Sequence, residues 1–175
     1  GFTNEPIRWS FIQETDTRRI NQRIEKQDWK KLKKYVLSRK GPNYRMLYFA
    51  GFAEIMMGNK DAGYEYIEQF VFHEKEELPF EFVTFNALEL LVTHYYQTQQ
   101  YEALIALDKR ADVWWFRLLE EETTNQMALM IADAYNRVGD NDASVKRLTE
   151  IVDRARTETA KEDRFVAIAR RVLGE

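Results

Sequence analysis

The chain has 175 residues, of which 45% are hydrophobic and 14% aromatic, and its net charge is −3. This content can bury a sizeable core as one domain or a short repeat array. There is no cysteine, which excludes disulfides, thiol chemistry and thiolate metal sites. No apolar run approaches the roughly 18 residues of a membrane-spanning helix, so we expect no membrane insertion of this segment. Since the chain opens at Gly1, we expect it to be the soluble part of a larger, bacterial protein.

The charge is distributed unevenly along the sequence. Residues 1–45 carry 12 Lys or Arg and 5 acids, whereas residues 46–125 carry 5 Lys or Arg and 15 acids. The remaining residues are balanced, with 9 of each sign. The positive first third and the negative middle are therefore expected to face different neighbours.

Only three prolines and seven glycines interrupt the chain, which predicts an all-α fold. Residues 1–15 form an arm, either extended or irregularly helical, and residues 16–175 form a single helical domain. Asp16, Asp28 and Asp61 are predicted to cap helices. In chain order, the predicted helices are 17–26, 29–40, 43–57, 61–72, 80–97, 101–109, a short one within 112–119, 123–138, 142–157 and 160–173. The last is expected to bury Phe165, Ile168, Ala169 and Val172 as an end cap while Arg164, Arg170 and Arg171 stay in water.

Three turns recur at nearly one period, at Gly58, Thr98 and Gly139. Five positions after each comes a small residue, and nine positions after each a large aliphatic one. The small residues are Gly63, Ala103 and Ser144, and the aliphatic ones are Ile67, Leu107 and Leu148. This pattern predicts stacked helical hairpins whose helices approach closely at the small residue. A first hairpin turns near Gln27 and fits the period loosely, because Leu32 is not small.

The fourth hairpin resembles a tetratricopeptide repeat (TPR). Val138-Gly139 follows Ile131, Ala132 and Tyr135 and precedes Ser144 and Leu148, as in that family. Repeat two keeps Ala50-Gly51, Gly58, Gly63 and Ile67, with Glu54 in place of an aromatic. Repeat three keeps Leu90, Ala103 and Leu107, with Leu91 in place of the small residue and His94 in place of the aromatic. The period of about 40 residues exceeds the family's 34, and the closing proline is missing, so the chain is similar to a diverged member.

The resemblance implies a right-handed superhelix of about four antiparallel hairpins with a C-terminal capping helix. It also implies a concave groove that binds a peptide or protein surface. The groove residues are expected to be Arg45, Tyr48, Phe52, Met56, Leu88, Tyr95, Tyr96, Gln126, Asp133 and Arg137. An alternative is that several of them pack against neighbouring repeats.

The residues that could carry chemistry do not form a complete catalytic set. Ser144 occupies the repeat's small position, and neither His73 nor His94 has a second metal-ligating histidine at a suitable spacing. We therefore expect no enzyme activity, no metal and no cofactor. The alternative is a small-ligand or enzymatic cleft built from His94, Tyr95, Tyr96 and the acidic residues 74–81, which would need a deep pocket.

Two further features leave alternatives open. Residues 29–40 form a basic helix that is either an ordinary amphipathic surface helix or a contact for an acidic partner or an anionic membrane. Nucleic acid is not expected, because the acidic middle would repel phosphates. Trp114, Trp115 and Phe116 either wedge between repeats or form a second interface. The positive first third could also dock on a second copy, so oligomeric state, compartment and partner identity stay open.

Overall fold

A computed structural model describes residues 14–39, 46–73, 82–111, 121–157 and 163–175, and every regular element in these ranges is an α-helix. The all-α prediction is confirmed for this part of the chain. The chain forms two compact units, residues 1–87 and 88–175, whose boundary falls inside the helix α5. Each unit is described by itself.

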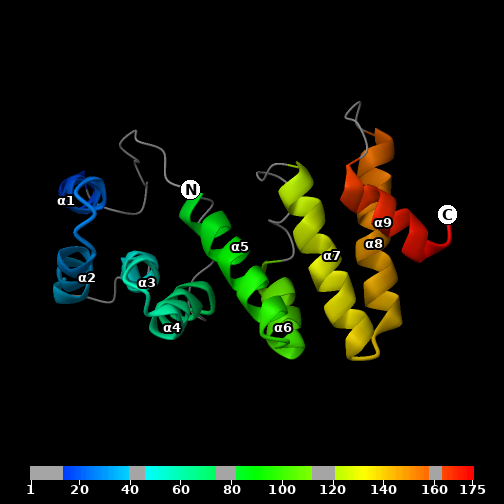
Figure 1. The fold of residues 1–175 in the computed structure, drawn as a ribbon, viewed down its shortest axis with the longest axis horizontal. Coiled ribbons are helices and arrows are strands. Elements are labelled where there is room, and N and C mark those ends of the chain that lie inside the picture. Colours follow the sequence, from blue (N-terminus) through cyan, green and yellow to red (C-terminus); the bar gives the residue numbers. More distant parts are fainter. Residues whose placement is uncertain (1–13, 40–45, 74–81, 112–120, 158–162) are drawn as a thin grey trace. The chain divides into compact units, whose positions relative to one another are not determined.

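Unit 1 contains two helical hairpins and the start of α5 (Figure 1). Helix α2 packs on α1 and α3, and α3 packs on α4. The elements are α1 (Glu14–Glu25), α2 (Trp29–Ser38), α3 (Leu47–Met56), α4 (Lys60–Val71) and α5 (Phe82–Gln97).

Unit 2 contains the rest of α5 and the remaining helices. Helix α7 packs on α6 and α8, and the last helix, α9, lies against both α7 and α8 (Figure 1). The elements are α6 (Tyr101–Ala111), α7 (Glu121–Arg137), α8 (Asn141–Thr157) and α9 (Arg164–Leu173). Part of the final predicted helix, residues 160–162, lies outside the described residues.

The four hairpins share one turn geometry. Each turn contains one residue in the left-handed region, with φ of 54° at Gln27, 89° at Gly58, 59° at Gln99 and 89° at Gly139. The next residue's N–H donates to the carbonyl five positions earlier, as from Asn59 to Glu54 (2.9 Å) and from Gln100 to Tyr95 (2.8 Å). This is the bonding that ends a helix at a left-handed residue. The third turn is therefore centred on Gln99 and not on Thr98, so the prediction was wrong by one residue.

This shift reassigns the third repeat. Counted from Gln99, the close-packing position is Leu104, which is fully buried, whereas the predicted Ala103 is only half-buried. Nine positions after Gln99, where the pattern predicts a large aliphatic residue, lies Asp108. Leu107, which was predicted for this place, is the preceding residue and is also buried. Counted in the same way, the position where the resemblance predicts an aromatic is held by Tyr95, which is buried, and not by His94.

The close helix crossings predicted at Gly63 and Ser144 are confirmed. A Cβ added to Gly51 would lie 2.7 Å from the Gly63 carbonyl oxygen, and one added to Gly63 would lie 2.8 Å from the Gly51 carbonyl oxygen. In the fourth hairpin, the Ser144 hydroxyl donates to the Ala132 carbonyl at 2.8 Å and is buried there. Ser144 is thus a packing residue with a satisfied hydroxyl.

Two of the three predicted caps were wrong. Asp28 caps α2 by accepting from the Lys31 N–H. Asp61, however, lies in the first turn of α4, whose N-cap is Asn59. Asp16 lies inside α1, buried, where it accepts a hydrogen bond from the Tyr35 hydroxyl and pairs with Arg39. Asp16 therefore joins α1 to α2.

A buried ion pair lies at Glu54, the position where the resemblance led us to expect an aromatic residue. Glu54 on α3 is buried and pairs with Lys33 on α2. The Lys33 ammonium lowers the pKa of Glu54 below its ordinary 4.5 through this charged hydrogen bond, against the opposing effect of burial. One lysine of the basic helix thus holds two hairpins together.

Candidate interaction groove

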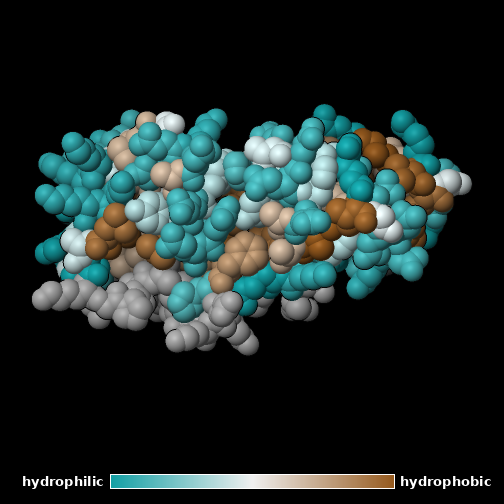
Figure 2. Space-filling model, turned by 90° about the horizontal axis from the view of Figure 1, so that it is seen from below, coloured by the Kyte–Doolittle hydropathy of each residue, from teal (hydrophilic) through white to brown (hydrophobic). Residues whose placement is uncertain are grey.

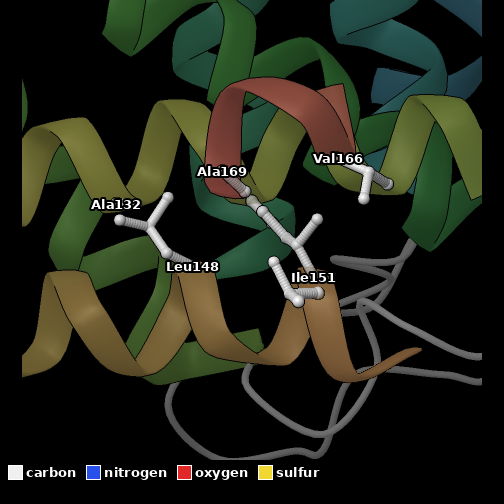
Figure 3. Packing of buried hydrophobic residues seen from close by; sticks show 7 residues of the cluster. Ala132, Leu148, Ile151, Val166 and Ala169 are labelled. Carbon is white, nitrogen blue, oxygen red and sulfur yellow. The ribbon is translucent and has the colours of Figure 1, made fainter. Parts of the chain in front are cut away.

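The floor of the site is the small hydrophobic core that α7, α8 and α9 share. Ala128 and Ala132 come from α7, Leu148, Ile151 and Val152 from α8, and Val166 and Ala169 from α9. Figure 3 shows Leu148 and Ile151 rising from α8 toward Val166 and Ala169 on α9. The alanines let α9 lie close to the hairpin. Asp163 fixes the start of α9 by accepting from the N–H groups of Phe165 and Val166.

An open groove of about 760 Å³ lies against this floor, within unit 2. Its apolar lining includes Leu129 and Met130 of α7, Val145 of α8, and Phe165, Ile168 and Val172 of α9. Three of these aliphatic side chains are exposed to water, at 50% for Val145, 39% for Ile168 and 65% for Val172. Figure 2 shows hydrophobic side chains gathered on the surface at the end of unit 2 that holds α8 and α9. Exposed aliphatics that converge on one concave surface are typical of a binding site.

One side of the groove is polar. The Tyr96 hydroxyl donates to Asp133 Oδ2 at 2.8 Å, and Arg137 Nε donates to the same oxygen at 2.8 Å. The Arg137 guanidinium also lies over the Tyr101 ring, 5.1 Å from its centroid. Burial, followed by the hydrogen bond to Asp133, raises the pKa of the Tyr96 hydroxyl, so it stays a neutral donor. This network fixes the orientation of Asp133 within the lining.

Within unit 2, the structure brings together part of the predicted groove set. Tyr96, Gln126 and Asp133 line the groove, and Arg137 is bonded to Asp133 beside it. Leu88 and Tyr95 are instead buried in the core, which corrects their prediction as groove residues. Their burial agrees with the alternative that the sequence left open, in which several members of the set pack in the interior.

The unit 1 members of the set have different environments. Tyr48 is fully buried and its hydroxyl bonds to Asn86, so it is a core residue and not a groove residue. Phe52 is half-buried and packs edge-on against Trp29, with ring centroids 5.5 Å apart. Met56 is exposed. Arg45 and the possible second interface, Trp114, Trp115 and Phe116, lie outside the described residues.

Two exposed side chains that line the groove were not predicted from the sequence. Ile168 and Val172 were predicted to be buried, but α9 buries Phe165, Val166 and Ala169 and turns these two outward. Arg170, predicted to stay in water, is half-buried and pairs with Glu175 at 3.1 Å.

The alternative cleft around His94 is not assembled as the sequence suggested. His94 is half-buried with its ring near that of Tyr95, and of the three predicted residues only Tyr96 lines the groove. The acidic residues 74–81 lie outside the described residues. In the described ranges, no group of three or more His, Asp or Glu side chains could hold a metal ion.

The basic helix α2 uses its charges unequally. Lys33 pairs with Glu54 and Lys31 with Asp28, whereas Lys30 and Lys34 are exposed. Helix α2 therefore has a buried apolar face and solvent-exposed lysines, as an amphipathic surface helix does. In the part of the chain that the structure describes, no helix is long and apolar enough to cross a membrane.

Comparisons of the chain with protein-family models, curated proteins and solved structures find no match. The class of protein therefore rests on the fold and the site. Over its described residues the chain is an all-helical protein with a repeated hairpin turn and an open, mainly apolar groove beside its last helix.

Proposed function

We propose that this chain is a non-catalytic protein-interaction module, and that it binds an amphipathic helix of a partner protein in the groove lined by α7, α8 and α9. The observation that carries the proposal is the exposure of Val145, Ile168 and Val172 on one concave surface. Covering these side chains would remove apolar area from water, at about 25 cal/mol per Å².

We further propose that the hairpins belong to a TPR-like array with a right-handed superhelix. The common turn geometry at Gln27, Gly58, Gln99 and Gly139 supports this, as does the close crossing at Gly63 and Ser144. In such an array the groove would be the concave surface of the final repeat and its cap.

A helix suits this groove better than an extended peptide. An extended backbone would bring unpaired N–H and C=O groups against Met130, Ile168 and Val172, and burying such groups without partners is costly. A helix satisfies its own backbone and offers apolar side chains at i, i+3, i+4 and i+7. Ile168 and Val172 are themselves one turn apart, so they present a ridge that side chains at this spacing can flank.

The charges around the groove indicate an acidic residue beside the partner's apolar face. Asp133, the one acid of the described lining, already accepts bonds from Tyr96 and Arg137. Arg171, next to Val172, is exposed and has no ion pair among the described residues. An acid on the partner would pair with Arg171, whereas a basic residue at the same place would be repelled by it.

The test is selection from a library of helical peptides that vary the apolar spacing and the flanking charge. We expect peptides with an i, i+3, i+4, i+7 apolar face and a flanking acid to be enriched. Val172→Asp should abolish their binding in fluorescence anisotropy. Val138→Asp is the matched control, because Val138 is 45% exposed but lies outside the groove lining. Equal loss in both variants, or enrichment of extended sequences, would refute the proposal.

A small apolar ligand is a second candidate for the same groove, because 760 Å³ lies within the range of small-molecule sites, about 300–1,000 Å³. It would contact Tyr96 but neither His94 nor Tyr95. An environment-sensitive apolar dye that binds the wild type and is displaced by small molecules, but not by selected helices, would favour it.

A further inference from the structure

The two hairpins of unit 1 carry opposite charge. Residues 14–39, which contain α1 and α2, have nine Lys or Arg and four acids. Residues 46–73, which contain α3 and α4, have one lysine and four acids. Helices α2 and α4 both pack on α3 (Figure 1). Unit 1 is therefore positive at its first hairpin and negative at its second.

The positive charge of α2 lies on the side of the helix that faces water. Leu32 and Val36 are buried, whereas Lys30 and Lys34, one turn apart, are exposed. These two lysines form no ion pair among the described residues. Leu37 follows on the same side and is 44% exposed. The outer face of α2 thus offers two uncompensated cations beside one apolar side chain.

Helix α4 has a matching negative face. Gly63 and Ile67 are buried, whereas Asp61 and Glu65, also one turn apart, are exposed. Neither acid forms an ion pair within the described ranges. Glu68 is half-buried and continues the same side of the helix. Neither this face nor that of α2 shares a residue with the interaction groove.

We infer that these two faces bind each other between copies of the chain, with α2 of one copy lying along α4 of the next. Four residues of an α-helix rise about 6 Å, so the lysines Lys30 and Lys34 have the same spacing as the acids Asp61 and Glu65. Two ion pairs therefore form whichever way the second helix runs. The charges favour a second copy as the occupant, because every copy carries both complementary faces.

The two sides of this contact differ, so it is heterologous. When two copies have joined, one α2 face and one α4 face remain uncovered, and further copies can add to them. Helices of ten and twelve residues offer less area than the roughly 1,200–2,000 Å² of a stable interface. Exposed ion pairs are also weak and screened by salt. The association is therefore reversible and is favoured by low salt and high protein concentration.

The test is sedimentation velocity of the full chain at about 0.01 M and about 1 M salt, where the Debye length is about 30 Å and about 3 Å. At the lower salt we expect the average sedimentation coefficient of the wild type to rise with protein concentration, and at the higher salt to stay at the monomer value. Lys30→Glu/Lys34→Glu and Asp61→Lys/Glu65→Lys should each stay monomeric, because both faces then have the same sign. An equimolar mixture of the two variants should associate again, since opposite faces are present on different copies.

The matched control is Lys109→Glu/Lys146→Glu, which changes the net charge as much as Lys30→Glu/Lys34→Glu does, at exposed lysines of unit 2. It should associate like the wild type. Circular dichroism checks that each variant folds, and if the variant of α4 does not, the variant of α2 and its control still decide the matter.

Three results would overturn the inference: a wild type that stays monomeric at low salt and millimolar concentration, an equal loss of association in the control, or a mixture that stays monomeric. A fourth would be a monomeric wild type that binds phosphatidylserine vesicles while Lys30→Glu/Lys34→Glu does not. That result would assign the outer face of α2 to an anionic membrane surface instead of a second copy.

Discussion

The crossing of α3 and α4 offers a sharp test of how these hairpins pack. Gly51→Ala would place its Cβ 2.7 Å from the Gly63 carbonyl oxygen and 2.7 Å from Ile67 Cγ1. Gly63→Ala would place its Cβ 2.8 Å from the Gly51 carbonyl oxygen. Because backbone oxygens cannot turn aside as a flexible side chain can, the two helices would have to move apart.

The expected magnitude comes from two opposing effects. Overpacking costs about 1–3 kcal/mol, and contacts this short with backbone belong at the upper end of that range. Replacing Gly by Ala inside a helix recovers about 1 kcal/mol. Each variant should therefore lose about 2 kcal/mol of unfolding free energy, which corresponds to a melting temperature lower by about 4–8 °C for a chain of this size.

Urea denaturation followed by circular dichroism measures this loss. Gly51→Ala/Gly63→Ala should lose less than the sum of the single variants, because one separation of the helices accommodates both methyl groups. Ala106→Gly, on the exposed face of α6, is the control that measures helix propensity alone. If either glycine variant were stabilised by about 1 kcal/mol, as propensity alone predicts, the close crossing would be refuted.

Three further predictions concern single polar contacts. The folded-state pKa of Glu54 is lowered, so its contribution to stability is complete above pH 4.5 and declines as the pH falls through the lower folded-state value. The urea midpoint of Glu54→Gln should therefore depend less on pH than that of the wild type between pH 5 and about pH 2. An equal pH dependence of the two midpoints would contradict the Lys33–Glu54 ion pair. Arg147→Met should destabilise the chain by about 3–5 kcal/mol, since it leaves the buried Asp108 without its cation; a loss below about 1 kcal/mol in thermal unfolding would contradict this. Tyr96→Phe should lower the free energy of unfolding by about 1 kcal/mol, because it removes the hydrogen bond to Asp133. It should also weaken helix binding less than Val172→Asp does. If anisotropy showed that Tyr96→Phe weakens binding more, most of the binding energy would come from the polar side of the groove.

The helices and most turns could be predicted from the sequence, because their signals are local. Glycines mark two turns, and at Gly58 and Gly139 the left-handed backbone favours them. The third turn was misplaced because Gln99 adopts the same conformation without a glycine. A local rule favours Gln99, because Thr98 is β-branched and β-branched residues are disfavoured at positive φ. Placing the turn at Thr98 moved every assignment in the third repeat by one residue.

Burial was harder to predict than helicity, because it depends on which helices meet. Tyr48, Leu88 and Tyr95 lie on helices with apolar residues on several sides, and only packing decides which side faces outward. The opposite error occurred for Ile168 and Val172, whose apolar character predicts burial although α9 has no further helix to cover them among the described residues. The groove is the consequence of that uncovered face.

The most direct test of the central claim is photocrosslinking from the groove itself. A benzophenone side chain at position 172, compared with one at position 138, would be activated in cells that naturally contain the protein, and the crosslinked peptide would be sequenced. We predict an adduct from position 172 alone, on the apolar face of an amphipathic helix. Equal adducts from both positions, or an adduct in an extended segment, would contradict the proposed function.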